Sequence, residues 1–409
     1  MNKTDRAEDL RPYPLEGIRV VEYGVFHAGP GASSILGDLG AEVIKIENKR
    51  GDPERFWTET GGTDFSMPDG ESLMFQISNR NKKGICLDIQ TEKGMDVFHR
   101  LIQRSDVFVT NLRKSTRISL GIDYAAVSKI NPMIIYAGVS GFGPQGPESD
   151  SGAFDPMGQA RSGMMFLGGS EEPVLLNLAV LDQTTAIALS QAILTALFYR
   201  EYKGVGQEVH ASLFGSALWF QHTNMMMKGL MSIDQISSER SLNSPLRNVF
   251  RCKDGKWMVG THHDERHWGL LCEVTGQPEL VQDPRFSDER VRSRHCAELI
   301  RIFDRVFETQ TRAQWLKRLQ AHGLMFSPVQ KIHEVFADPQ ALENGYIVDF
   351  NHRVLGKKKI PGYPIHFSRV KAGTRTLAPG LGEHTNAVMK EIGIRDEEIA
   401  ELEKQGIIQ

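Results

Sequence analysis

The sequence predicts an α/β protein: a Rossmann-like, open and mostly parallel sheet, followed by a second, smaller α+β domain. Three observations favour this fold class. Short apolar strands alternate with helical segments over the first 140 residues, a long apolar helix follows, and a strand pair with helices behind it forms a separate block. We expect residues 1–224, completed by 332–409, to form the large domain and residues 225–331 to form the small one.

The first strand–helix–strand unit comprises the strand Ile18–Tyr23, the glycine-rich turn GVFHAGPG, a helix over 32–39 and the strand Glu42–Glu47. The pattern then recurs twice along the chain, with strands at 84–89, 106–110 and 133–139 and helices at 92–104 and 123–130. Such alternation is typical of parallel strands joined by helical crossovers.

The glycine-rich turn contains Gly24, Gly29 and Gly31, a spacing that does not give the G-x-G-x-x-G pattern of dinucleotide-binding proteins. Two interpretations stay open. The turn could serve only tight strand-to-helix packing, with Pro30 in the first helical turn. Its backbone N–H groups could also face an anion or a developing oxyanion.

The long apolar helix is expected over about 183–203, where Gly204 ends it, and a strand with alternating apolar residues follows at 209–213. Asp182 stands directly before this helix. It could be a helix N-cap, which contributes about 1 kcal/mol. It could also be a fixed, ionised nucleophile on a buried scaffold.

A mobile connection is expected to lead out of the sheet domain, with Met225–Met227, Met231 and a polar run through Ser244. A strand pair follows, FRCKDGKWMVG, whose turn is Asp254-Gly255. Three helices come next, and the chain closes with a helical segment; their expected ranges are 266–275, 296–309, 312–322 and 383–405.

The composition excludes several classes of function. The 409 residues include 48 basic and 51 acidic side chains, a balance that favours neither a nucleic-acid nor a membrane partner. The N-terminus has no signal-peptide pattern, and no apolar run is long enough to suggest a membrane span. We therefore expect a cytoplasmic protein that acts on small molecules.

A histidine-rich segment, His262–His267, places His263 and His267 four residues apart, as on one face of a helix. The zinc-protease pattern requires Glu directly after the first histidine, and Asp264 stands there instead. We expect no metal site.

Several motifs occur in one order along the chain: PLEGIRVVEYG, HAGPGASSILGDLGAEVIKIE, NRNKKGICLDI, DVFVTNL, FDPMGQARSG, LDQTTA, YKGVGQEVHASL, DGKWMVG and LGEHT. In these motifs the chain resembles the class III CoA-transferases, the CaiB/BaiF-like family of formyl-CoA transferase and carnitine CoA-transferase. The superfamily also holds the α-methylacyl-CoA racemases. The resemblance spans about Pro14 to Gly393.

This resemblance implies transfer of coenzyme A from an acyl-CoA donor to a carboxylic acid acceptor, with no cofactor beyond coenzyme A. It implies covalent intermediates on one aspartate, whose place Asp182 occupies. His27 and Gly29 are the other expected catalytic residues, through the oxyanion-binding turn, although formyl-CoA transferases have glutamine at the position of His27. The expected coenzyme A contacts are Ala28, Asn79, Asn81, Lys82, Asn111, Leu112, Arg113, Phe154 and Asp155.

The cations in this set suggest an electrostatic site for the phosphates of coenzyme A. Arg80, Lys82 and Lys83 precede or open one strand, and Arg113 and Lys114 follow another. Each alone is typical of a solvated basic residue. Together they are expected to concentrate positive charge at one edge of the sheet.

Alternatives to the transferase function remain. A racemase needs a second proton carrier where Phe154 stands, and Phe154 cannot carry a proton. A non-catalytic subunit of a heteromeric transferase is disfavoured by the presence of Asp182. Known members interlock as two threaded rings, so we expect an interlocked homodimer or a heteromer with a paralogue. Phe154, Trp219 and Met225–Met227 are compatible with a less polar acceptor acid, such as an aromatic or branched one.

Overall fold

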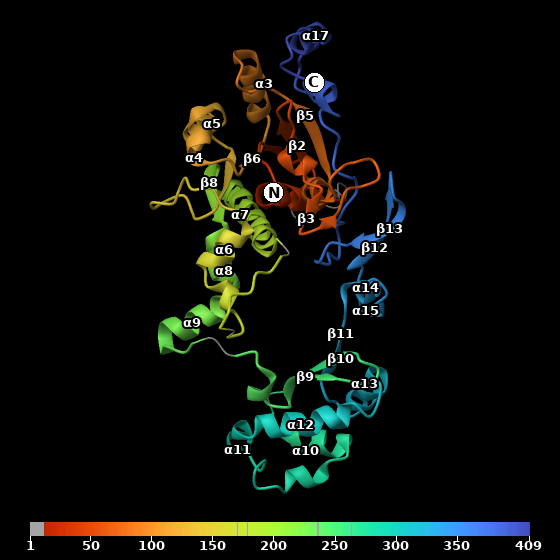
Figure 1. The fold of residues 1–409 in the computed structure, drawn as a ribbon. Helices are drawn as coiled ribbons and strands as arrows, with labels where there is room; N and C mark the ends of the chain where they lie inside the picture. Colours follow the sequence, from red (N-terminus) through yellow and green to blue (C-terminus); the bar gives the residue numbers. More distant parts are fainter. Residues whose placement is uncertain (1–11, 170, 178, 235–236, 263) are drawn as a thin grey trace, which may run out of the picture. The chain divides into compact units, whose positions relative to one another are not determined.

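The computed structural model describes residues 12–169, 171–177, 179–234, 237–262 and 264–409 (Figure 1). The chain divides into two compact units. The first comprises the described residues of Met1–Met165, Leu175–Met225 and Gly345–Gln409, and the second comprises Phe166–Val174 and Met226–Asn344. The domain boundaries expected from the sequence stay a prediction, since these units are defined only by where contacts concentrate.

A six-stranded parallel sheet forms the centre of the first unit, in the order β5-β2-β1-β6-β7-β8. Its strands are β1 (Arg19–Glu22), β2 (Glu42–Glu47), β5 (Lys82–Cys86), β6 (Val107–Thr110), β7 (Ile135–Ser140) and β8 (Gln207–Ser212). The strand order is that of a doubly wound fold, which confirms the predicted fold class. Strand order reverses between β1 and β6, and ligands of such sheets bind at the carboxyl ends of the strands at this point.

Helices cover both faces of the sheet, and its central strands β6 and β7 are accordingly rich in apolar residues. One face packs against α3 (Glu92–Gln103), α5 (Tyr124–Ile130), α16 (Thr385–Glu391) and α17 (Asp396–Lys404). The other packs against α1 (Ala28–Asp38) and the long α7 (Val180–Lys203), which also pack closely against each other. Shorter elements of the unit are α2 (Leu73–Asn79), α4 (Lys114–Ser119), α6 (Asp155–Arg161), α8 (Leu213–Phe220) and the hairpins β3 (Glu59–Thr60)–β4 (Thr63–Asp64) and β12 (Ile347–His352)–β13 (Gly356–Pro361).

By length and composition alone, α7 is apolar enough to cross a membrane. Core helices of soluble proteins meet the same criterion, and α7 packs against α1, α8, β7 and β8. Figure 1 shows it alongside β8. This packing buries 44% of the apolar window of α7.

The second unit contains a three-stranded antiparallel sheet, β11-β10-β9, with Gly255 at a φ of 73° in the predicted hairpin turn. Its core is aromatic and includes Phe250, Phe303 and Trp315. The elements are β9 (Arg247–Arg251), β10 (Trp257–Thr261), α10 (Arg266–Thr275), α11 (Glu289–Arg294), α12 (Cys296–Phe307), α13 (Arg312–Ala321), β11 (Phe326–Val329), α14 (Ile332–Val335) and α15 (Pro339–Glu343).

Two predicted segments differ from the structure. Helix α1 begins at Ala28 rather than at residue 32, because Pro30 lies inside its first turn and needs no N–H donor there. The connection expected from Met225 through Ser244 begins as a helix instead, α9 (His222–Met231).

Candidate active site

The candidate site lies at the carboxyl ends of β1 and β6, where the sheet order reverses. The β1–α1 loop, which ends at His27, follows β1, and Asn111 follows β6. Helix α7 runs antiparallel to the strands: near its C-terminus, Arg200 Nη2 donates to Asp106 Oδ1 at 2.8 Å, just before β6 begins. The start of α7, with Asp182, therefore belongs to the same carboxyl edge as His27 and Asn111.

Asn111 braces the β1–α1 loop. Its side chain accepts the Val25 N–H at 2.9 Å and donates to the Val25 carbonyl at 2.6 Å. A Cβ atom at Gly24 would lie 2.7 Å from Asn111 Oδ1, and one at Gly29 would lie 3.2 Å from Asn111 Cβ. The close approach of Asn111 thus favours glycine at positions 24 and 29.

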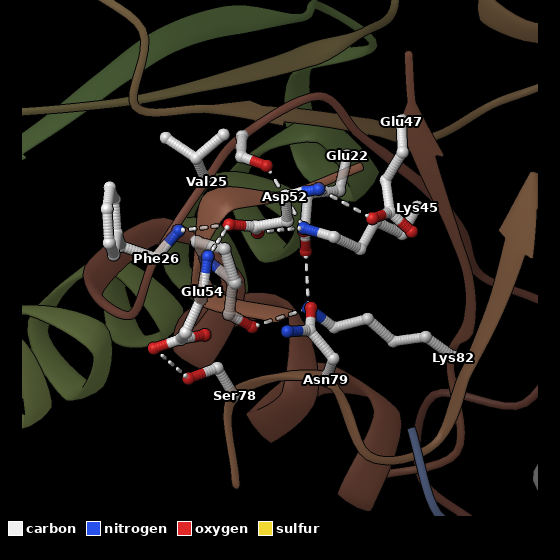
Figure 2. A network of polar contacts seen from close by, with 12 residues as sticks. Glu22, Val25, Phe26, Lys45, Glu47, Asp52, Glu54, Ser78, Asn79 and Lys82 are labelled. Atoms are coloured by element: carbon white, nitrogen blue, oxygen red, sulfur yellow. Dashed lines mark hydrogen bonds and ion pairs between the residues drawn. The ribbon is translucent and has the colours of Figure 1, made fainter. Parts of the chain in front are cut away.

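Phe26 adopts a left-handed backbone conformation, with a φ of 57°, which is costly for a bulky residue. Asp52 compensates for this, because its Oδ1 atom accepts the Phe26 N–H at 3.1 Å (Figure 2). The Phe26 ring meets the exposed Phe154 ring edge-on, with centroids 5.3 Å apart. Phe26 and Phe154 thus form an aromatic wall beside the loop.

A buried network of charges supports the loop from below (Figure 2). Lys45 Nζ donates to Glu22 and Asp52, both at 2.9 Å, and to the Gly24 carbonyl at 3.0 Å. Lys82 Nζ donates to the second Glu22 oxygen at 2.7 Å. Burial alone would raise the pKa of Glu22, but Lys45 and Lys82 lower it to about 2. The network is therefore internally neutralised and holds the loop in one conformation.

His27 precedes α1 and lies almost fully buried. Its Nδ1 atom is 2.7 Å from Ser78 Oγ, and its Nε2 atom is 2.9 Å from Gln183 Oε1. Burial lowers the pKa of the His27 ring below its ordinary value, so the ring is neutral at physiological pH. The backbone N–H groups of Ala28 and Gly29 follow, in the first turn of α1, where a helix offers donors to an anion.

The N-cap interpretation of Asp182 is wrong. Helix α7 begins at Val180 after Ala179, so Asp182 lies inside the first turn. Asp155 caps the helix instead: its Oδ2 atom accepts the N–H groups of Leu181 at 2.6 Å and Asp182 at 3.1 Å. Gln159 in turn donates to the other oxygen of Asp155. The Asp182 carboxylate is consequently left without a structural task in the helix.

Asp182 is partly exposed, and its surroundings disfavour its charge. Burial of the carboxyl group, and then the nearby Asp155, raise its pKa to about 7. A carboxylate with such a pKa is weakly solvated and therefore more reactive as a nucleophile once ionised. The Asp182 carboxyl group therefore changes its charge near neutral pH.

The structure does not bring the expected cations together. Lys82 is fully buried in the network below the loop, and Lys83 pairs with Glu42 at the amino end of the sheet. Arg113, at the opposite edge, is exposed, and no carboxylate of the described chain lies within ion-pair distance of it. Arg113 is thus the cation among the expected coenzyme A contacts whose charge is available, and its neighbour Lys114 is exposed as well.

The remaining expected contacts have structural partners. Asn79 accepts from Lys82 at 2.8 Å, and Asn81 donates to Asp38 at 2.7 Å while accepting the Arg375 N–H at 2.7 Å. Leu112 packs against the core of the sheet. The roles of these residues in coenzyme A binding stay predictions.

Sequence reasoning missed Ser78, Gln183, Asp52 and Glu54. Ser78 and Gln183 hold the His27 ring, and Asp52 holds the loop. No spacing rule marks them, because Ser78 lies in the last turn of α2, 51 residues after His27, and Gln183 lies 156 residues after His27. Only the adjacency of Gln183 to Asp182 gave a signal.

Among the residues that the structure describes, no group of three or more His, Cys, Asp or Glu side chains is arranged to hold a metal ion. His263 lies outside the described residues. The expected absence of a metal site at the histidine-rich segment stays a prediction.

Comparison with known proteins matches residues 15–385 to the family described as CoA-transferase family III. An acyl-CoA transferase of Fusarium pseudograminearum is 33% identical, over 96% of this chain and 88% of its own length. A succinyl-CoA:glutarate CoA-transferase of Mus musculus is 32% identical, over 97% of this chain and 90% of its own length. A crystal structure of a CAIB/BAIF family protein from Brucella suis superposes with a TM-score of 0.81 at 28% identity, covering 93% of this chain and all of that chain.

Proposed function

The chain belongs to CoA-transferase family III and is an acyl-CoA:carboxylate CoA-transferase, and from this premise we propose that Asp182 carries the transfer through covalent intermediates. The observation that carries the proposal is the position of Asp182: it lies in the first turn of α7, partly exposed, with its capping role taken by Asp155. A carboxylate that is neither capping a helix nor paired with a cation is available as a nucleophile.

The proposed cycle balances without any redox step. The ionised Asp182 attacks the thioester carbonyl, the tetrahedral oxyanion collapses, and the C–S bond breaks to give an acyl-aspartyl anhydride and the thiolate of coenzyme A. The thiolate then attacks the aspartyl carbonyl, which releases the donor acid and forms an aspartyl thioester. The acceptor carboxylate then attacks the carbonyl of the aspartyl thioester, which releases the thiolate of coenzyme A and forms a new anhydride. The thiolate attacks the acceptor's carbonyl in this anhydride, so that the acceptor leaves as its coenzyme A thioester and Asp182 is regenerated.

Each of these steps forms an oxyanion, which requires fixed donors. The N–H groups of Ala28 and Gly29 at the start of α1 are suited to this task, because N–H groups in a first turn have no acceptor within their own helix. Asn111 holds the preceding loop through its two hydrogen bonds to Val25. In comparable sites, removal of one such donor costs about 100- to 1,000-fold in rate.

Trapping tests the covalent route. Borohydride or hydroxylamine added during turnover should modify the peptide that contains Asp182, since both reagents attack an anhydride or thioester and neither attacks a resting carboxylate. Peptide mass analysis with and without acyl-CoA gives the readout. Full consumption of donor with an unmodified Asp182 peptide would instead support direct attack by the acceptor on the thioester.

We also propose that the acyl or acceptor group has an apolar portion. The aromatic wall of Phe26 and Phe154 continues to Trp57, whose ring lies 6.4 Å from that of Phe26. Phe154 and Trp57 keep 57% and 40% of their surface exposed, which suits contact with an apolar ligand. A screen of aliphatic, branched, aromatic and dicarboxylic acids, read by mass, tests this; a preference for dicarboxylic acids over all apolar ones would contradict it.

A second copy of the chain is the proposed partner. Phe198 and Tyr202 on α7 and Trp219 on α8 are 64%, 72% and 73% exposed, an apolar surface that is unusual for a monomer. An interlocked homodimer, or a heteromer with a paralogue, would cover it. Light scattering of the purified chain should give the mass of two chains, and a monomer at micromolar concentration would contradict the homodimer.

A further inference from the structure

Glu54 is a buried carboxyl group for which the proposed mechanism has no use. It lies in the 3₁₀ turn η1 (Pro53–Phe56) and has no exposed surface. Its Oε1 atom is 3.3 Å from Ser78 Oγ (Figure 2), and its Oε2 atom has no hydrogen-bond partner in the described part of the chain. An ionised carboxylate with an unpartnered oxygen in the interior is costly, whereas a neutral acid is tolerated.

The charges around Glu54 act on its pKa in opposite directions, and those that raise it prevail. Asp52, on the same turn, carries a negative charge close by, while the ammonium groups of Lys45 and Lys82 donate their hydrogen bonds elsewhere, to Glu22 among others. Burial, followed by Asp52, raises the pKa of Glu54 to about 7, against the weaker opposing effects of Ser78, Lys45 and Lys82. At pH 6 the group is therefore mainly protonated.

The hydrogen atoms between Glu54 and Gln183 can be assigned in one consistent direction. Gln183 Oε1 is an acceptor, so His27 Nε2, 2.9 Å away, carries the ring hydrogen. His27 Nδ1 is then an acceptor, and the single hydrogen of Ser78 Oγ points to it across 2.7 Å. That leaves Ser78 Oγ free to accept a hydrogen from protonated Glu54 Oε1.

We propose that Glu54 is a positioning residue: held as a neutral acid, it acts through Ser78 and His27 to turn the Gln183 side chain so that its amide NH₂ is presented beside Asp182. The proposal rests on the proposed role of Asp182 and adds a donor next to it. Gln183 is exposed, so the face of its amide opposite His27 is open to substrate. An NH₂ group there can donate to the oxyanion that forms on attack by Asp182.

When Glu54 loses its proton to solvent, the hydrogen bonds from Glu54 through Ser78 and His27 to Gln183 reverse their direction. The Ser78 hydroxyl then turns to the charged Oε1 atom, because no other hydroxyl or N–H group of the described chain is placed to donate to it. His27 takes its hydrogen on Nδ1 to face Ser78 Oγ, and its bare Nε2 atom requires the Gln183 amide to rotate. The carbonyl oxygen of Gln183 then faces the reaction and repels an oxyanion.

The pH dependence of kcat/KM tests the proposal. Asp182 must be ionised and Glu54 neutral, so the wild-type profile should rise and fall around pH 7, with a loss of about tenfold or more between pH 7 and pH 9. Glu54→Gln keeps a neutral donor toward Ser78 and cannot ionise, so its profile should rise and then stay level to pH 9. An unchanged alkaline fall in Glu54→Gln overturns the proposal.

Ser78→Ala removes the relay without changing either carboxyl group. We expect about tenfold lower kcat/KM at pH 7 and no alkaline fall. The matched control is Ser105→Ala. Ser105 is also buried, and its hydroxyl also donates to a helix carbonyl, that of Leu101 at 2.6 Å. It lies just before β6, at the amino end of the sheet, whereas the site lies at the carboxyl end. A Ser78→Ala profile that follows the wild type, as the Ser105→Ala profile should, overturns the relay.

Nitrogen NMR of the resting enzyme separates this proposal from the proposed function. With ¹⁵N-labelled histidine, and His27→Gln for assignment, the His27 ring should carry its hydrogen on Nε2 at pH 6 and shift it toward Nδ1 by pH 9. Glu54→Gln should keep it on Nε2 throughout. A hydrogen on Nδ1 at pH 6, or a tautomer that is independent of pH in the wild type, overturns the relay; failure of aspartate trapping would leave these signals unaffected and would count against Asp182 alone.

Discussion

The buried network below the β1–α1 loop and the candidate site at its surface both contain desolvated carboxyl groups, and their pKa values move in opposite directions. Glu22 receives hydrogen bonds from Lys45 and Lys82, and its pKa falls to about 2. Asp182 pairs with no cation among the residues that the structure describes, and burial and then the nearby Asp155 raise its pKa to about 7. Burial is common to both, so the direct partner decides the charge.

This contrast has consequences for stability. Glu22 stabilises the fold above its unfolded pKa of about 4.5, and this contribution is lost as pH falls toward 2. Asp182 behaves oppositely: the folded state holds its proton more tightly than the unfolded chain, so stability is lost as pH rises from about 3.8 to about 7. The paired carboxylate Glu22 thus stabilises the fold, whereas the proposed nucleophile Asp182 lowers its stability when it ionises.

Asp182→Asn breaks the reactive half of the comparison and should have the largest effect. We expect a loss of about 1,000-fold or more in kcat, because the covalent route disappears. The melting temperature should rise relative to wild type at pH 8 and match it at pH 3, since the variant no longer ionises. Turnover within a few-fold of wild type would show that Asp182 is not the nucleophile.

Lys45→Met breaks the structural half. It leaves Glu22 and Asp52 with one cation fewer in the interior, and we expect about 3–5 kcal/mol of destabilisation in urea unfolding. Lys83→Met is the control, because Lys83 is partly exposed and pairs with Glu42 and Glu391 at the sheet edge; its cost should stay within about 1 kcal/mol. Equal costs for the two variants would contradict the division between structural and reactive charges.

Asp155→Asn sharpens the comparison within the site. Asparagine keeps an oxygen that can cap α7 but removes the negative charge near Asp182. The pKa of Asp182 should fall, so the acid limb of kcat/KM should move to lower pH by about one unit. A limb that stays in place would mean that burial alone sets the pKa of Asp182.

Arg113→Ala tests the cation that the structure leaves available, with the smallest expected effect. A remote phosphate contact contributes uniform binding, so KM for acyl-CoA should rise about tenfold while kcat changes less than about twofold. Lys129→Ala, which removes an exposed cation on α5, should leave both constants as they are. An effect of Arg113→Ala on kcat alone would place this residue at the reacting centre.

The recurrence of short apolar strands between helical segments was enough to predict the sheet. Apolar periodicity also located Asp182 at the start of a core helix. It could not assign the cap of that helix to Asp155, since the capping residue lies 26 and 27 positions before the N–H groups that it accepts. The sequence also suggested that Lys82 belongs to a cluster of available cations. Only the folded structure shows that its ammonium group donates to Glu22 in the interior.

Asp52 links the two regions, because one oxygen receives Lys45 and the other receives the N–H groups of Phe26 and Glu54. For divergence within such a lineage, this means that Glu22, Lys45 and Asp52 can be exchanged only as a set, since any single change strands a charge. The exposed aromatic side chains above them carry no such constraint. We therefore expect new acid specificities to arise by substitution at Trp57 and Phe154, while Glu22, Lys45 and Asp52 are seldom substituted.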